Sequence, residues 1–243
     1  MKGRAALITG GSSGIGLAIA RALGEDGYSL TVSARRPDKL EAAVEELRAD
    51  GIEVESVPAN MAEEDEIKAL VERHREKWGR LDVLINNAGV GIGGPIADQK
   101  TKHLDMQLSV NLRGVYLTLR ECIPLLKEAG AEHGKALVVN TASIAGKFGQ
   151  PWLATYSATK HAVVGLTQAA HGELAESGIQ LTAFCPGFVD TPMTDWVKDN
   201  VPSDAMIQPS DLGEAVRFLL RTSPACIVPE IQFVRAGDVQ EKN

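Results

Sequence analysis

Short apolar runs alternate with longer amphipathic segments along the chain. The first run, residues 5–8, is continuously apolar, as in a strand that is buried on both faces of a sheet. Further strands are predicted at 29–33, 52–57, 82–85, 136–139, 179–184 and 231–234, and helices at 17–25, 38–50, 63–78, 103–127, 154–176 and 211–221. Strands that alternate with helices predict right-handed crossovers and a parallel sheet. The predicted fold class is therefore α/β.

Length and composition limit the classes that the chain can belong to. Single α/β domains often reach about 250 residues, so these 243 residues predict one domain over 1–243, with a mobile substrate lid at about 188–208. The net charge of −7 argues against nucleic acid or an anionic membrane as the main partner. Cys122, Cys185 and Cys226 lack metal-ligand spacing and predict reduced thiols in a cytoplasmic protein without a metal site.

A glycine loop at residues 9–16 follows the first predicted strand and precedes a predicted helix. Strand, glycine loop and helix in this order are typical of a dinucleotide site. Glycine lets the backbone approach a pyrophosphate closely, and the amino end of the helix attracts its charge. The alternative is a purely structural turn.

The second predicted strand is followed by Arg35 and Arg36. A site for NAD usually has an acidic residue here, about 20 residues beyond the glycine loop, on the ribose 2′-hydroxyl. This chain has no acid at that point, and guanidinium groups suit a 2′-phosphate. The pair therefore predicts NADP(H); the alternative is two solvated arginines at the start of a helix.

The middle of the chain adds two expectations about the predicted helices. Asn111 lies inside the helix at 103–127, where its side chain competes for backbone hydrogen bonds, and this indicates either a function or a local kink. His74, on the charged helix at 63–78, is expected at the surface. The helices at 103–127 and 154–176 have apolar residues on two sides, which predicts a homo-oligomer.

Tyr156 and Lys160 lie four residues apart on a predicted helix and so share one face. The pKa of a tyrosine is about 10, and a cation at about 4 Å would lower it by roughly three units at an effective dielectric near 20, before desolvation opposes the shift. Such a pair can donate and accept a proton near neutral pH. Ser143 can donate a hydrogen bond to a substrate oxygen. The alternative is a chance pair, which is common on helices.

The motifs together resemble the short-chain dehydrogenase/reductases over nearly the whole chain, in particular the type of the 3-oxoacyl-carrier-protein reductases. The matching positions are Thr9, Gly10, Gly14, Gly16, Asn86, Asn87, Ala88, Gly89, Asn111, Ser143, Tyr156, Lys160, Pro186, Gly187 and Thr191. The resemblance implies a doubly wound, Rossmann-type sheet of seven parallel strands. It also implies hydride transfer between NADP(H) and a ketone or secondary alcohol, and a tetramer as the assembly.

The resemblance also implies roles for single residues. Tyr156 would be the acid/base, Ser143 would hold the reacting oxygen, Lys160 would bind the nicotinamide ribose and lower the pKa of Tyr156, and Asn111 would anchor a proton-relay water. The cofactor contacts that the resemblance implies fall into three groups. At the phosphates they are Gly10, Ser12, Ser13, Ile15 and Gly16, and near adenine they are Asn60 and Met61. Along the remainder of the dinucleotide they are Asn87, Ala88, Gly89, Pro186, Gly187, Val189 and Thr191.

Two further points concern the substrate and a competing function. Six residues are expected to contact the substrate: Val90, Phe148, Trp152, Phe188, Met193 and Trp196. The alternative for these residues is ordinary packing in the core. A redox sensor that binds NADP(H) without turnover is the second functional hypothesis; the complete catalytic set argues against it. The segment at 231–237 replaces the glycine-rich end that many members of the family have, and Asn60 stands where many have Asp.

Overall fold

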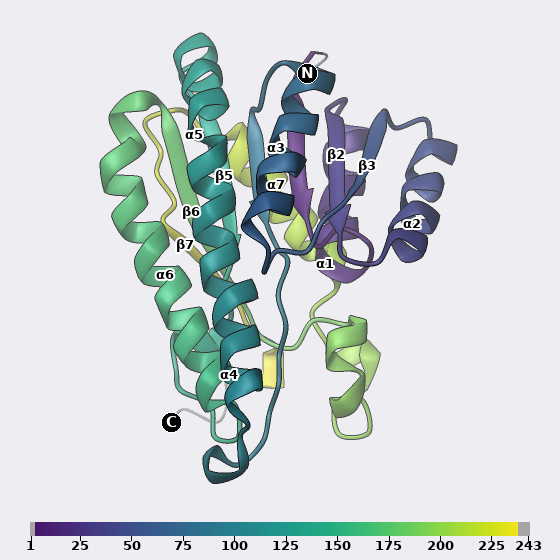
Figure 1. The fold of residues 1–243 in the computed structure, drawn as a ribbon, viewed down its shortest axis with the longest axis vertical. Helices are drawn as coiled ribbons and strands as arrows, with labels where there is room; N and C mark the ends of the chain where they lie inside the picture. Colours follow the sequence, from purple (N-terminus) through teal and green to yellow (C-terminus); the bar gives the residue numbers. More distant parts are fainter. Residues whose placement is uncertain (1–2, 238–243) are drawn as a thin grey trace.

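The computed structural model describes residues 3–237, which form one sheet of seven parallel strands in the order β3-β2-β1-β4-β5-β6-β7 (Figure 1). The strands are β1 (Ala5–Thr9), β2 (Ser29–Ala34), β3 (Val54–Pro58), β4 (Val83–Asn86), β5 (Ala136–Thr141), β6 (Ile179–Pro186) and β7 (Glu230–Phe233). β1 pairs directly with β4, so the winding reverses between them. The doubly wound sheet that the resemblance implied is confirmed, and a ligand crevice is expected at the carboxyl ends of β1 and β4.

Two layers of helices cover the sheet (Figure 1). The helices α1 (Gly14–Glu25), α2 (Pro37–Ala49) and α7 (Pro209–Arg221) pack on one face, and α3 (Glu64–Trp78), α5 (Gly114–His133) and α6 (Ala154–Leu174) pack on the other. Successive strand residues enter different cores: Leu7 belongs to one and Ile8 to the other, and both are fully buried. Burial on both faces explains why the strand sequences are continuously apolar.

The helix predicted at 103–127 is not one regular helix. It consists of α4 (Thr101–Leu108), a π-helical turn (Ser109–Arg113) and α5. The turn contains Asn111, whose side chain is fully buried. Single π-helical turns often occur at functional sites. The irregularity expected at Asn111 is therefore confirmed.

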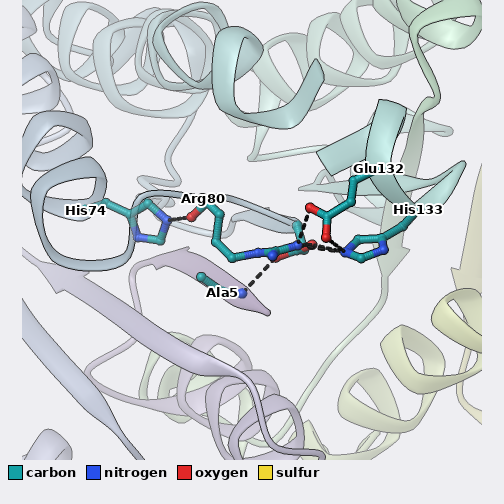
Figure 2. Close-up of polar contacts among 6 residues, drawn as sticks. Ala5, His74, Arg80, Glu132 and His133 are labelled. Atoms are coloured by element: carbon teal, nitrogen blue, oxygen red, sulfur yellow. Dashed lines mark hydrogen bonds and ion pairs between the residues drawn. The ribbon is translucent and has the colours of Figure 1, made fainter. Parts of the chain in front are cut away.

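A cluster of polar side chains closes the opposite end of the sheet, at the amino ends of β1 and β4 (Figure 2). The buried carboxylate of Asp82 accepts a hydrogen bond from the backbone N–H of Ala5 at 2.8 Å. It also accepts two from the guanidinium of Arg80, at 2.7 and 2.8 Å, and Arg80 pairs with Glu132 at 3.3 Å. The cluster satisfies a buried charge at the end of the sheet that faces away from the crevice.

The surface position predicted for His74 is wrong, because its imidazole is fully buried beside this cluster. Its Nδ1 lies 2.8 Å from the hydroxyl of Thr31. Its Nε2 lies 2.9 Å from the carbonyl oxygen of Arg80 (Figure 2). Burial lowers the pKa of His74 to about 4. The ring is therefore neutral at physiological pH and acts as a structural crosslink.

The segment 188–208, here called the lid segment, lies beyond the carboxyl ends of the strands (Figure 1). It forms two short 3₁₀ helices, Pro192–Val197 and Ser203–Ala205. Its first part is tied to its later part by an ion pair between Lys198 and Asp190 at 2.9 Å. Among residues 3–237, no helix combines the length and the apolar character that crossing a membrane requires.

Candidate active site

A cleft of about 1450 Å³ opens at the carboxyl ends of the strands, where the winding reverses. Small-molecule sites typically measure about 300–1000 Å³, so this cleft has room for a dinucleotide and a second molecule. Its lining comes from the glycine loop, the ends of β2, β4, β5 and β6, the start of α6 and the lid segment. Within residues 3–237, no group of His, Cys, Asp and Glu side chains is arranged to hold a metal ion.

The glycine loop packs directly against the loop that follows β4. Gly10 has a φ of +67°, and a Cβ there would lie 2.8 Å from the Cα of Ala88. The hydroxyl of Thr9 accepts hydrogen bonds from the backbone N–H groups of Asn87 and Ala88, each at 3.1 Å, and the Asn87 side chain donates to the Gly10 carbonyl at 3.1 Å. The two loops therefore form one rigid wall, and the role of Thr9 in it was not predicted from the sequence.

The predicted phosphate-binding residues divide into two groups. Gly10, Ser12, Ser13 and Ile15 line the cleft, at the amino end of α1. Gly16 lies behind the lining, and a Cβ there would lie 2.4 Å from the carbonyl oxygen of Gly10. Gly16 is thus required for close packing of the loop on the helix, not for direct contact with a ligand.

The two arginines after β2 lie at one end of the cleft. Arg35, Arg36, Asn60 and Met61 all belong to its lining, with the end of β2 beside them. The side-chain oxygen of Asn60 already accepts a hydrogen bond from the backbone N–H of Ala62 at 3.2 Å. Since an amide oxygen has two lone pairs, it can accept a second bond from an adenine amino group.

Tyr156 and Lys160 project from the first turns of α6 into the middle of the cleft. The Lys160 Nζ lies 5.6 Å from the centre of the Tyr156 ring. It donates a hydrogen bond of 2.7 Å to the carbonyl oxygen of Thr141, at the end of β5, a partner that sequence reasoning did not find. Burial lowers the pKa of Lys160 to about 8. The ammonium therefore remains mostly charged at neutral pH and loses its proton in mildly alkaline solution.

The pKa of Tyr156 shifts in the opposite direction to the one predicted from its spacing to Lys160. Burial raises the pKa of the phenol above 10, and the hydrogen bond with Ser143 opposes this shift. Desolvation therefore outweighs this hydrogen bond, and the neutral phenol is the resting form. A neutral phenol is the state needed to donate a proton to a carbonyl oxygen.

Ser143 is held at the carboxyl end of β5 by contacts on both sides of its hydroxyl. The Oγ donates to the carbonyl oxygen of Pro186 at 3.3 Å and accepts from the backbone N–H of Ala145 at 3.1 Å. The serine thus lies within hydrogen-bonding reach of Tyr156, from a neighbouring element, and both groups line the cleft.

Asn111 lies behind the cleft wall and forms two hydrogen bonds with the backbone of Val90. Its side-chain oxygen accepts from the Val90 N–H, and its Nδ2 donates to the Val90 carbonyl, both at 2.8 Å. A second donor bond of 3.2 Å reaches Thr159 on α6. The side chain therefore connects the π-helical turn, the loop after β4 and α6; its implied role in a water relay stays a prediction.

The remaining predicted cofactor contacts lie where β6 ends. Pro186, Gly187, Val189 and Thr191 line the cleft, as do Asn87, Ala88 and Gly89 opposite them. A Cβ on Gly14 would lie 2.8 Å from the Cγ2 of Thr191, so the lid segment begins in contact with the amino end of α1. The structure thus brings the predicted site residues together around one cleft, with Gly16 and Asn111 immediately behind it.

The predicted substrate-facing residues form an aromatic wall. Trp152 and Trp196 lie with their ring centres 5.5 Å apart, and Trp196 meets Phe188 edge-on at 6.1 Å. Trp152 is 51% exposed and Trp196 is 56% exposed, so ordinary core packing does not explain them. All six predicted residues line the cleft: Val90, Phe148, Trp152, Phe188, Met193 and Trp196.

A comparison of the sequence with models of protein families identifies the family that has this arrangement of residues. A model of the short chain dehydrogenases matches residues 4–201. The chain belongs to the short-chain dehydrogenase family. It is therefore an oxidoreductase that acts on a carbonyl or on the corresponding alcohol, as the resemblance implied.

Three proteins illustrate what this short-chain dehydrogenase is similar to. A 3-oxoacyl-[acyl-carrier-protein] reductase of Staphylococcus aureus is 36% identical over 96% of this chain and 97% of its own length. The structure of a variant of actinorhodin polyketide ketoreductase with NADPH has a TM-score of 0.86 at 36% identity, over 94% of this chain and 95% of that one. The 3-ketoacyl-(acyl-carrier-protein) reductase from Brucella melitensis, complexed with NADH, has a TM-score of 0.86 at 32% identity, over 95% and 97%.

Proposed function

We propose that the protein reduces a ketone with NADPH, or oxidises the corresponding secondary alcohol with NADP⁺, and that its substrate is a 3-oxoacyl or related carbonyl compound. The observation that carries this proposal is the convergence of Tyr156, Ser143 and Lys160 in a cleft whose far end has Arg35 and Arg36. The relatives named above include structures with NADPH and with NADH, so the choice between the two cofactors rests on these arginines.

The cleft suits a phosphorylated dinucleotide. The amino end of α1 faces it, and no Asp or Glu belongs to its lining within residues 3–237. Guanidinium groups bind phosphate in a fork, so Arg35 and Arg36 would hold the 2′-phosphate. The pyrophosphate would lie at Gly10, Ser12, Ser13 and Ile15, adenine near Asn60 and Met61, and the rest along Asn87, Ala88, Gly89, Pro186, Gly187, Val189 and Thr191.

When bound, the reduced nicotinamide ring supplies a hydride to the carbonyl carbon. Tyr156 would donate its phenolic proton to the carbonyl oxygen, and Ser143 would hold that oxygen by a hydrogen bond as its negative charge develops. Lys160 would bind the ribose and stabilise the phenolate that remains. Asn111 would keep the Val90 backbone, and with it the loop after β4, against α6. The lid segment would exclude water.

The test is a panel of ketones and secondary alcohols with NADPH or NADH, in which nicotinamide absorbance is followed for the wild type and for Tyr156→Phe. The variant removes one hydroxyl, so NADPH binding by fluorescence should persist while turnover falls by about 10²–10⁴-fold. Turnover that survives in the variant rejects Tyr156 as the acid. A wild type that binds NADPH but reduces nothing in the panel favours the redox sensor.

We also propose a homo-oligomer, with a tetramer as its form. Four large apolar side chains on α4 and α5 are exposed, namely Leu104, Met106, Leu108 and Tyr116, with exposed fractions of 41%, 42%, 39% and 50%. A shallow apolar groove beside them is lined by Leu108, Leu112, Tyr116 and Leu166, which joins this surface to α6. A monomer in light scattering at micromolar concentration would reject the assembly. The cytoplasmic location remains part of the proposal, supported by three free cysteines.

A further inference from the structure

The three tryptophans of the chain differ in how much of the side chain is exposed and in whether the indole N–H has a partner. Trp78 on α3 is half-buried, and its N–H donates a hydrogen bond of 2.9 Å to the hydroxyl of Thr31. Trp152 and Trp196 line the cleft and are more than half exposed, and their N–H groups meet no acceptor among residues 3–237. Large apolar rings that are exposed together in a cleft indicate a binding surface.

Trp152 has a backbone conformation that suits glycine better than tryptophan. Its φ is +70°, a left-handed conformation that a bulky side chain rarely adopts, and within residues 3–237 no other residue except glycine has a positive φ. The Gly94 N–H donates to the Trp152 carbonyl at 2.8 Å, and the nearby Gln150 N–H donates to the hydroxyl of Ser157 on α6 at 3.1 Å. Strain of this kind is concentrated at ligand sites, where the surrounding structure holds it in place.

The glycine-rich loop after β4 makes room for the Trp152 ring. A Cβ on Gly93 would lie 2.0 Å from that ring, so the indole fits only because position 93 is glycine. A Cβ on Gly91 would lie 3.7 Å from the ring of Tyr156. The indole and the proposed proton donor therefore both lie against one short loop, and a group that packs on Trp152 lies beside the position of the reacting carbonyl.

Trp196 reaches the same wall from the lid segment. It lies on the 3₁₀ helix Pro192–Val197, whose start is fixed by reciprocal hydrogen bonds between Thr191 and Thr194. The Trp196 and Trp152 ring centres are 5.5 Å apart with the ring planes inclined by 42°, and Phe188 meets Trp196 edge-on. The two indoles thus touch with one part of their surfaces, and the exposed remainder forms a continuous aromatic surface.

An apolar chain does not require such a surface. The free energy of burying apolar area does not depend on ring geometry, so Leu or Val would cover an aliphatic substrate equally well. Aromatic pairs gain additional free energy from stacked or edge-to-face contact. The strained backbone at Trp152 and the glycine at position 93 are needed only because the side chain at 152 is a large ring. The wall is therefore suited to another aromatic ring.

We propose that the ketone substrate carries a planar aromatic or conjugated ring system, and that this ring packs on Trp152 and Trp196. This inference rests on the proposed function, because it names the substrate class of the same site. The protein then prefers a ketone with an aromatic ring over a ketone whose ring is saturated. Trp152 and Trp196 are specificity-determining residues and take no part in proton or hydride transfer.

The experiment compares matched pairs of ketones with NADPH. Benzylacetone and its naphthyl analogue are each paired with the ketone in which the rings are fully hydrogenated. The rings are not conjugated with the carbonyl, so its intrinsic reactivity is the same within a pair. Burial of area alone favours the saturated member, which has more apolar surface. In the wild type, kcat/KM should instead be higher for the aromatic member by about 2- to 13-fold, the value of one aromatic pair beyond its area burial.

Four variants show whether the preference belongs to the two indoles. Trp152→Gly suits the left-handed backbone, and it should lower kcat/KM more for the aromatic member than for the saturated one, as should Trp196→Leu. Trp196→Phe keeps a smaller ring and should retain part of the preference. Phe218→Leu removes an exposed ring on α7, outside the cleft, and should leave the ratio unchanged. NADPH binding, measured by the fluorescence of the nicotinamide, should be the same in all of them.

The outcomes distinguish this proposal from the proposed function. If the wild type reduces the saturated member of each pair as well as the aromatic one, or if the Trp152 and Trp196 variants lower both members equally, the aromatic site is refuted while the reductase assignment stands. Weaker NADPH binding in these variants would assign the indoles to the cofactor and would also refute it. If the wild type binds NADPH but reduces no ketone, including ethyl acetoacetate, which has no ring, the proposed function fails, and with it this inference.

Discussion

The buried imidazole of His74 makes the stability of the protein depend on pH. Its Nε2 lies beside the carbonyl of Arg80 and must carry the proton, so its Nδ1 accepts the Thr31 hydroxyl, which itself accepts the indole N–H of Trp78. A second proton on Nδ1 would require the Thr31 hydroxyl to turn its hydrogen away. The neutral ring is thus matched to its surroundings, and desolvation further penalises the charged one.

The size of the effect follows from the two pKa values. The pKa of His74 is about 4 in the folded protein, against 6.5 for an ordinary histidine. Because the unfolded chain binds the proton first, stability from this group is complete above about pH 6.5 and is lost as pH falls towards about 4. At about pH 5 the free energy of unfolding is about 2 kcal/mol lower than at neutral pH because of this group. Below both pKa values this loss reaches its limit of about 3 kcal/mol.

Urea unfolding at about pH 8 and about pH 5 measures this loss, and a variant isolates it from the contribution of the carboxylates. His74→Gln cannot titrate, so its stability should change less between the two pH values than that of the wild type, by about 2 kcal/mol, although it is less stable at pH 8. His161→Gln removes an exposed imidazole and is the matched control. Equal pH dependence in wild type and His74→Gln would refute the reasoning.

Three further predictions concern the cleft. Replacing Arg35 and Arg36 together by Ala should weaken NADPH binding by at least about tenfold, the value of one charge-assisted contact, and leave NADH binding nearly unchanged in fluorescence titrations; equal losses would reject the 2′-phosphate contact. NADPH binding should weaken as pH rises above about 8, where Lys160 loses its proton, and Lys160→Arg should abolish this dependence; a wild-type affinity that stays flat to about pH 10 contradicts it. Gly93→Ala should displace the Trp152 ring, since the new Cβ would lie 2.0 Å from it, and should raise KM for aromatic ketones while NADPH binding persists; an unchanged KM would show that the ring does not contact the substrate.

The parts of the site that the sequence predicted correctly share a physical reason. Continuous apolar runs indicate strands with two covered faces, and parallel strands present their carboxyl ends at one edge of the sheet. Residues that directly follow such strands, such as Gly10, Asn87 and Ser143, must therefore meet there. Tyr156 and Lys160 joined them because residues four apart share a helical face. Each of these inferences needs only local geometry and the order of the elements.

The parts that the sequence did not predict depend on partners distant in the chain. His74 lies on a helix whose sequence is highly charged, and this suggested a surface position. Its hydrogen-bond partner in the core is the hydroxyl of Thr31 on β2, 43 residues away. The pKa of Tyr156 was predicted with the wrong sign because a nearby cation can be inferred from spacing, whereas desolvation depends on which segments cover the phenol. The same holds for Trp152, whose indole ring fits only because the distant position 93 is glycine. In this protein the residues for hydride and proton transfer can be found from local motifs. The arrangement of the aromatic side chains that would contact a substrate depends on contacts between distant parts of the chain.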